Sequence, residues 1–210
     1  MDRTALAACI DHTVLGPRTT RADARAAAET AATWGMHLCV PPRTLGAVDA
    51  SFPGELVTVV GFPHGTDTPA TKAAAAGEAV ALGADIIDLV PDLGAAVAGD
   101  TARLRADIAA VTAAVAVDVR VICETGLLPP AAITEVATAA VAAGAAGLKT
   151  STGYGGEGAT APAVRQLAAH LPVKASGGIR SYDDALRLLD AGASRLGTSS
   201  GPAVLADAPE

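Results

Sequence analysis

Lysine, aromatic side chains, cysteine and histidine are all scarce in this chain of 210 residues. Alanine dominates the apolar half of its composition, and only five residues are Phe, Trp or Tyr. The formal net charge of -7 argues against a nucleic-acid-binding protein, because such a protein needs a basic face to neutralise phosphates. A small anionic substrate stays compatible with that charge, because backbone N–H groups and a few lysines can form a local anion site.

Three cysteines, Cys9, Cys39 and Cys123, are odd in number and form no CxxC motif, which favours a reducing, cytoplasmic compartment. The N-terminus lacks the apolar core of a signal peptide, and Thr, Glu and Gly interrupt the longest apolar stretches, so we expect no membrane span. The four histidines show neither HxH nor HExxH spacing. We therefore expect neither a metal nor another cofactor.

Short β-like runs alternate with longer helical runs along the whole chain. The expected strands are Ile10–Thr13, Leu38–Val40, Val57–Val60, Ile86–Val90, Val119–Cys123, Gly147–Lys149, Val173–Ala175 and Arg195–Gly197. The expected helices are Ala22–Trp34, Thr68–Leu82, Asp100–Ala116, Pro130–Ala143, Ala161–His170 and Ser181–Ala191. Most of the strand runs are continuously apolar, as in a parallel sheet covered on both faces. The alternation predicts the α/β class and a (β/α)8 TIM barrel, with residues 1–210 as one domain; a doubly wound sheet has the same local pattern and stays open as an alternative.

Two of the three lysines occupy an unusual position, at the end of an expected strand. Lys149 and Lys174 each close an apolar run and precede a loop of small residues, whereas Lys72 lies within an expected helix. A buried strand-end lysine is paired or desolvated, and a desolvated lysine beside a second cation can lose its proton and attack a carbonyl. We expect a Schiff-base lysine with a cationic neighbour. Spacing does not decide which lysine is the nucleophile, and two structural lysines in ion pairs are the alternative.

An acidic residue, Asp88, interrupts the apolar strand Ile86–Val90. Buried acids are rarely unpaired, so we expect Asp88 to pair with a cation. In a barrel the active site lies at the carboxyl ends of the strands, where the two lysines are also expected. The same carboxyl group is therefore a candidate proton relay beside the lysines.

Gly- and Ser-rich loops follow the last two expected strands and contain Gly177, Gly178, Ser199 and Ser200. Such loops let the backbone approach a phosphate, and barrels often bind phosphate after strands seven and eight. Tight turns without a ligand are the alternative. The GxGxxG pattern at Gly153–Gly158 predicts a flexible anion-binding loop and no dinucleotide site, because the next strand ends in lysine where a ribose-binding acid belongs.

Eight segments together resemble one family, the deoxyribose-phosphate aldolases, which are class I aldolases. They are IDHTVL at 10–15, CVPP at 39–42, VVGFPHG at 59–65, GADIIDLV at 83–90, ETGLL at 124–128, LKTSTG at 148–153, VKASGGIR at 173–180 and RLGTSSG at 195–201. The resemblance implies a lyase that reversibly cleaves 2-deoxy-D-ribose 5-phosphate to D-glyceraldehyde 3-phosphate and acetaldehyde through a lysine Schiff base. It also implies a role in nucleoside catabolism.

The resemblance implies roles for individual residues. Lys149 looks like the Schiff-base nucleophile, Lys174 like the second lysine that favours its free amine, and Asp88 like the acid/base partner. Positions that bind substrate or an active-site water are implied for Asp11, Thr13, Thr152, Gly153, Gly177, Gly178, Ser199 and Ser200. The family usually has Asn where this chain has Asp92, which predicts an added negative charge near the site.

The expected partners are a phosphosugar and an aldehyde, with no nucleic acid and no membrane. The family resemblance suggests a homodimer or homotetramer. Two other functions stay open: a related lysine aldolase that acts on another aldehyde or sugar phosphate, and a barrel that binds a phosphosugar without catalysis.

Overall fold

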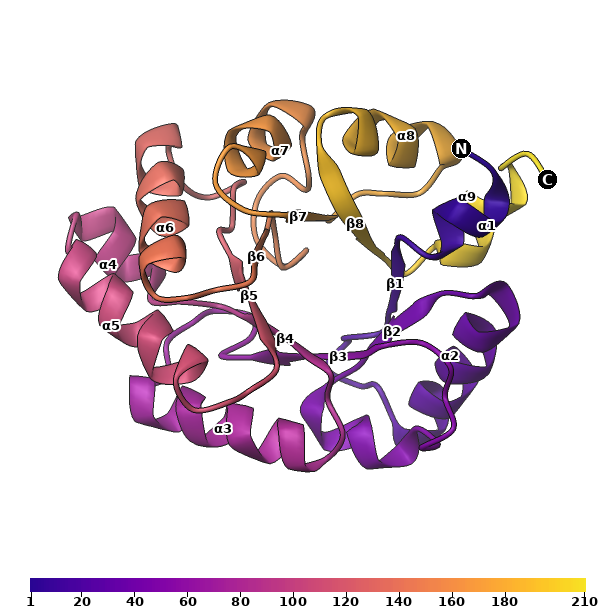
Figure 1. The fold of residues 1–210 in the computed structure, drawn as a ribbon, viewed down its shortest axis with the longest axis horizontal. Coiled ribbons are helices and arrows are strands. Elements are labelled where there is room, and N and C mark those ends of the chain that lie inside the picture. Colours follow the sequence, from indigo (N-terminus) through magenta and orange to yellow (C-terminus); the bar gives the residue numbers. More distant parts are fainter.

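Eight parallel strands form a closed barrel in a computed structural model that describes residues 1–210 (Figure 1). The strands are β1 (Ile10–Thr13), β2 (His37–Cys39), β3 (Leu56–Val60), β4 (Ile86–Leu89), β5 (Asp118–Ile122), β6 (Gly147–Lys149), β7 (Val173–Ser176) and β8 (Ala193–Thr198). Each strand pairs with its neighbours in chain order, and β1 also pairs with β8. The closure confirms the predicted (β/α)8 barrel and rules out the doubly wound alternative, whose sheet has two open edges.

Helices surround the barrel on all sides (Figure 1). The longer ones are α2 (Arg21–Trp34), α3 (Pro69–Ala81), α5 (Thr101–Thr112), α6 (Pro130–Ala142), α7 (Ala161–Ala168) and α8 (Tyr182–Asp190). All six were predicted, although α5 ends at Thr112 rather than Ala116. Sequence analysis missed the short elements α1 (Arg3–Ala7), η1 (Pro42–Ala47), α4 (Leu93–Ala98) and α9 (Gly201–Ala206), which are too short for a helical period to emerge. None of the helices combines the length and the apolar character needed to cross a bilayer.

Local signals explain where these helices begin and end. The Thr68 hydroxyl accepts a hydrogen bond from the Thr71 N–H, and Pro69 occupies the first helical position of α3. Thr20 and Asp23 form a reciprocal capping box at the start of α2. Gly83 follows the end of α3 with φ 96°, a left-handed conformation that glycine adopts without strain.

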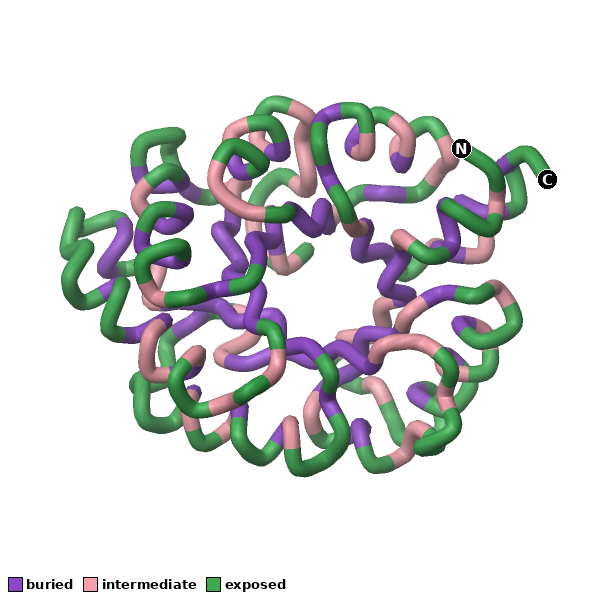
Figure 2. Tube along the Cα trace, in the orientation of Figure 1, coloured by how far each residue is buried: buried purple, intermediate pink, exposed green.

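Side chains alternate between the two faces of each strand and build two separate apolar clusters. The main core of 47 buried residues lies between the barrel and the helices, and Figure 2 shows the strands as a buried ring inside partly exposed helices. A small second cluster of Cys39, Val57, Val59 and Ile86 packs separately. Because Leu38, Val60 and Ile87 on the same strands belong to the main core, alternation places this second cluster inside the barrel.

The third lysine, Lys72, forms a buried ion pair outside the barrel. Its Nζ on α3 lies 2.8 Å from Oδ2 and 3.1 Å from Oδ1 of Asp107 on α5. The same Oδ2 accepts the backbone N–H of Asp92 at 2.8 Å. This pair therefore ties α3, α5 and the start of α4 together and takes no part in the barrel interior.

Replacing Lys72 with Met should lower the free energy of unfolding by about 3–5 kcal/mol, because it leaves the Asp107 carboxylate buried without a cation. Chemical denaturation measures this loss directly. The matched control is the double variant Lys72→Met/Asp107→Asn, which keeps an acceptor for the Asp92 N–H but no charge. It should recover much of the loss. A loss below about 1 kcal/mol in the single variant would contradict a buried, stabilising pair.

Candidate active site

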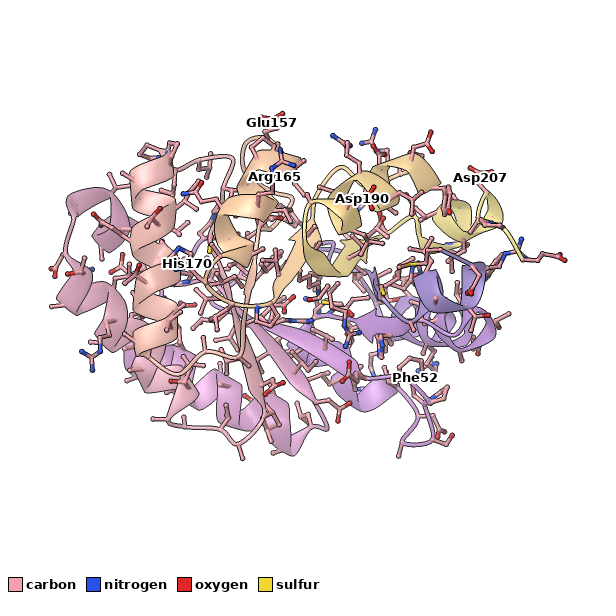
Figure 3. All side chains as sticks on the ribbon, turned by 45° about the horizontal axis from the view of Figure 1, so that its top comes forward. Phe52, Glu157, Arg165, His170, Asp190 and Asp207 are labelled. Carbon is pink, nitrogen blue, oxygen red and sulfur yellow. The ribbon has the colours of Figure 1, made fainter.

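A cavity lies at one end of the barrel, among the loops that follow the strands. Figure 3 labels Glu157, in the loop after β6, at the top of the view, and Phe52, in the segment before β3, in its lower right part. A cavity of about 360 Å³ opens among residues at and beyond the carboxyl ends of β1, β6, β7 and β8. The cavity therefore lies at the end of the barrel where sequence analysis expected the site.

Most of the predicted site residues line this cavity. They are Thr13, Lys149, Thr152, Gly153, Gly177, Gly178, Ser199 and Ser200. The other three, Asp11, Asp88 and Lys174, are buried and do not line it. Lys149 connects the two groups, because it lines the cavity and is also buried, at 2% exposed.

The buried group centres on the carboxylate of Asp88, on β4. Its Oδ2 lies 3.0 Å from Nζ of Lys149 and 2.9 Å from Nζ of Lys174. Its Oδ1 accepts a hydrogen bond from Nε of Arg120 at 2.7 Å. Three cations from β5, β6 and β7 therefore share one carboxylate.

A second carboxylate, that of Asp11 on β1, extends this network. Its Oδ2 lies 2.6 Å from Nζ of Lys174 and 2.9 Å from Nη2 of Arg120, and its Oδ1 lies 3.1 Å from Nη1 of Arg195. Arg195 in turn contacts Glu55, just before β3. Lys174 thus has two carboxylate partners, whereas Lys149 has one.

Burial and charge compete in setting the protonation of this network. Burial alone would raise the pKa of Asp88, but Arg120, Lys149 and Lys174 outweigh it and hold that pKa well below its usual range. The pKa of Asp11 is lowered in the same way, against its burial, chiefly by Lys174 and Arg120. Burial would lower the pKa of Lys174, but Asp11 and Asp88 outweigh it and raise that pKa. At neutral pH both acids are ionised and Lys174 is an ammonium.

The two lysines differ in their carboxylate partners and in their position relative to the cavity. The network joins four cations, Lys149, Lys174, Arg120 and Arg195, to the three carboxylates of Asp88, Asp11 and Glu55. Lys149 is also the lysine that lines the cavity, and its Nζ lies 5.8 Å from the centre of the Phe62 ring. A carbonyl compound in the cavity therefore meets the amine of Lys149 rather than that of Lys174.

Backbone geometry shapes the opposite side of the cavity. Gly177 and Gly178 adopt φ values of 98° and 80°, which an L side chain rarely tolerates. They turn the chain directly after β7, beside Ser199 and Ser200 beyond β8. Arg180 adds a positive charge to the same lining. Consecutive backbone turns with a nearby guanidinium suit an anionic group such as a phosphate.

Hydrogen bonds fix two of the polar residues near the amine. The Thr152 N–H donates to both carboxylate oxygens of Glu124 at 3.2 Å, and its hydroxyl accepts the Tyr154 N–H at 3.1 Å. The hydroxyl of Thr13 donates to the carbonyl of Asp11 at 2.9 Å. Each hydroxyl keeps further bonding capacity towards the cavity.

Sequence analysis missed Arg120 and Arg195, which supply half of the cations in the network. Arg120 interrupts an apolar strand as Asp88 does, and this shared pattern could have predicted that the two side chains pair inside the barrel. We had predicted that the negative charge of Asp92 lies near the site, but Asp92 does not line the cavity. Asp92 caps α4, and its Oδ2 pairs with Arg103 at 2.6 Å.

The lowered pKa values of Asp88 and Asp11 predict a dependence of stability on acid. A carboxyl group whose pKa is lowered on folding stabilises the protein above its unfolded pKa of about 3.9, and that contribution is lost as pH falls through the folded pKa. We expect the free energy of unfolding to fall as pH drops below about 4. In Asp88→Asn the fall should be shallower. Denaturant titrations at a series of pH values measure both slopes, and equal slopes would contradict the assignment.

Similar proteins were found among curated sequences and among solved structures. No protein-family model matches the chain. A deoxyribose-phosphate aldolase from Halobacterium salinarum is 47% identical over 212 residues, with 100% of both chains covered. One from Thermus thermophilus is 49% identical over 210 residues, with 96% of both chains covered.

Solved structures match over nearly the whole barrel. A tetrameric deoxyribose phosphate aldolase from Aeropyrum pernix gives a TM-score of 0.89 at 30% identity, covering 97% of this chain and 91% of that one. A structure described as an aldolase gives a TM-score of 0.91 at 29% identity, covering 98% and 94%. Sequence identity at this level over the full length settles the family, and the chain belongs to the deoxyribose-phosphate aldolases.

Proposed function

We propose that residues 1–210 form one catalytic domain that reversibly cleaves 2-deoxy-D-ribose 5-phosphate to D-glyceraldehyde 3-phosphate and acetaldehyde. The observation that carries this proposal is the asymmetry of the lysine pair. The amine of Lys149 faces the cavity, while Lys174 is held behind it by two carboxylates. A neutral amine beside a fixed cation is the arrangement that a Schiff-base nucleophile needs.

The reaction begins at the aldehyde carbon, C1, of the open-chain sugar. The neutral amine of Lys149 adds to C1, and loss of water from the adduct gives an iminium ion. Asp88 and Lys174 lie within hydrogen-bonding distance of one another and next to this nitrogen, so they are placed to move the protons that addition and dehydration require.

The iminium ion then accepts electrons from the C2–C3 bond. As that bond breaks, the C3 hydroxyl loses its proton and becomes the aldehyde of glyceraldehyde 3-phosphate. The two carbons left on Lys149 form an enamine. Protonation at C2 and hydrolysis release acetaldehyde and restore the free amine, so the protons balance over one turnover.

The substrate phosphate fits the opposite end of the cavity. The loops at Gly177, Gly178, Ser199 and Ser200 and the guanidinium of Arg180 provide donors for an anion there. Binding the phosphate at this end and the aldehyde at Lys149 would hold the sugar extended between them. Thr13 and Thr152, near the amine, are suited to bind a hydroxyl or a water, and Asp11 acts indirectly by holding Lys174.

We also propose a homodimer or homotetramer in a cytoplasmic compartment. The Aeropyrum pernix relative is described as tetrameric, which supports assembly without fixing its size for this chain. All three cysteines are unpaired, and two of them are buried, as is usual in a reducing compartment. Light scattering after size-exclusion chromatography measures the assembly directly.

Sodium borohydride should trap a reduced adduct on Lys149 when deoxyribose 5-phosphate is present, and peptide mass spectrometry locates it. Lys149→Leu should form no adduct and lose at least about a thousandfold in turnover, because the nucleophile is gone. Thermal unfolding of the variant should stay cooperative. Substantial turnover in Lys149→Leu would exclude the proposed mechanism, and a wild-type adduct on Lys174 would exchange the roles of the two lysines.

Lys174→Met should still place the adduct on Lys149 but form it more slowly, with turnover lower by about 10²- to 10⁴-fold, because a proton carrier is removed. Lys174→Arg is the matched control, since it keeps the positive charge between Asp11 and Asp88. It should retain more activity than Lys174→Met. Equal turnover in the two variants would show that the charge at this position has no part in the reaction.

A further inference from the structure

One cavity-lining side chain has no hydrogen-bond partner within the protein. Ser176, the last residue of β7, is 6% exposed, and its hydroxyl makes no hydrogen bond to any protein group. It lines the same cavity as Lys149. Leaving a buried hydroxyl without a partner costs about 1–3 kcal/mol, so buried polar groups of this kind usually serve a ligand or a water.

The main-chain groups of Ser176 have partners, so its buried hydroxyl is the one polar group of this residue that lacks one. The Thr150 hydroxyl donates to the Ser176 carbonyl at 3.0 Å and accepts the Ser176 N–H at 2.9 Å. Both main-chain groups are therefore satisfied by the residue that follows β6. Ser176 lies opposite Gly197 in the β7–β8 register, and a methyl group on Gly197 would collide with the Ser176 hydroxyl oxygen, which therefore lies over this glycine. The absence of a side chain at Gly197 makes the space that the serine occupies.

The position along β7 places Ser176 between the two ends of the bound sugar. Lys174 lies two residues earlier, which in a strand is about 6–7 Å on the same face. Lys149 is the register partner of Lys174. Gly177 and Gly178, at the phosphate end of the cavity, follow Ser176 directly. The hydroxyl therefore lies beyond the lysine pair and just before the phosphate loop.

We propose that the Ser176 hydroxyl binds the C4 hydroxyl of the substrate and is a specificity-determining residue for the aldehyde that carries the phosphate. This inference rests on the proposed function. C4 is the carbon next to the phosphate-bearing C5, as Ser176 is the residue next to the phosphate loop. The C3 hydroxyl has a different requirement, because it must exchange its proton with the acid/base groups near Lys149.

The test uses the synthetic direction, with acetaldehyde and one of two acceptors. D-glyceraldehyde 3-phosphate supplies the future C4 hydroxyl, and 3-oxopropyl phosphate has the same chain without it. In Ser176→Ala we expect kcat/KM for D-glyceraldehyde 3-phosphate to fall by about 5- to 150-fold, the equivalent of one buried hydrogen bond. For 3-oxopropyl phosphate it should stay within about twofold of wild type.

Ser151→Ala is the matched control, because Ser151 is equally buried but does not line the cavity. Its ratio of kcat/KM between the two acceptors should equal that of wild type. Ser176→Thr keeps a hydroxyl and should keep more of the preference for D-glyceraldehyde 3-phosphate than Ser176→Ala. Loss of that preference in the threonine variant alone would point to a steric effect and overturn the proposed hydrogen bond.

A measurement without any acceptor separates this proposal from the lysine chemistry. Enamine formation exchanges the methyl hydrogens of acetaldehyde with solvent in D2O, and Ser176→Ala should exchange at the wild-type rate. Slower exchange, or an equal loss with both acceptors, would assign the hydroxyl to the catalytic water or to Lys149 and overturn the inference. Unchanged kinetics with both acceptors would also overturn it. Absence of exchange and of borohydride trapping in wild type would instead reject the proposed function.

Discussion

The ionised carboxylate of Asp88 is the interaction on which the interior of the barrel depends. It is fully buried, and a buried carboxylate is tolerated only when cations and hydrogen bonds replace its lost hydration. Arg120, Lys149 and Lys174 supply these from three consecutive strands. No shorter segment of the chain could do so, because the contacts span 86 residues between Asp88 and Lys174. The charged centre therefore exists only once the barrel has closed.

Closure also makes the two lysines unequal. Lys149 and Lys174 are register partners on adjacent strands, and in the sequence both follow an apolar run and precede small residues. Asp11, on β1, reaches Lys174 and Arg195 because β1 pairs with β8 beside β7. The pairing of β1 with β8 thus brings the carboxylate of Asp11 to Lys174 and not to Lys149. This geometry explains why Lys174 is held by two carboxylates, while Lys149 has one carboxylate partner and lines the cavity.

The sequence predicted the parts of this structure that depend on local pattern. Short runs, most of them continuously apolar, located all eight strands, and Lys149 ends β6 as predicted. The predicted strand end at Lys174 was wrong, because β7 continues to Ser176. Short helices such as α4 were missed because six residues show no period. Arg120 was missed for another reason: its importance comes from partners on distant strands. Ser176 belongs to the predicted phosphate loop, but its unpaired hydroxyl could not be foreseen from local pattern. Asp92 was misplaced because a cap and a pairing with Arg103 decide its direction.

Two glycines show how the barrel accommodates such long side chains. A methyl group on Gly147 would lie 3.2 Å from Cγ of Arg120, and one on Gly197 would lie 2.8 Å from Cε of Lys174. Each glycine faces a cation from the neighbouring strand, where a side chain would take the volume that the cation needs. The other side of the interior, around Val57 and Ile86, is filled by apolar side chains instead. Glycine at these two positions thus leaves room inside the barrel for the long cationic side chains that surround Asp88 and Asp11.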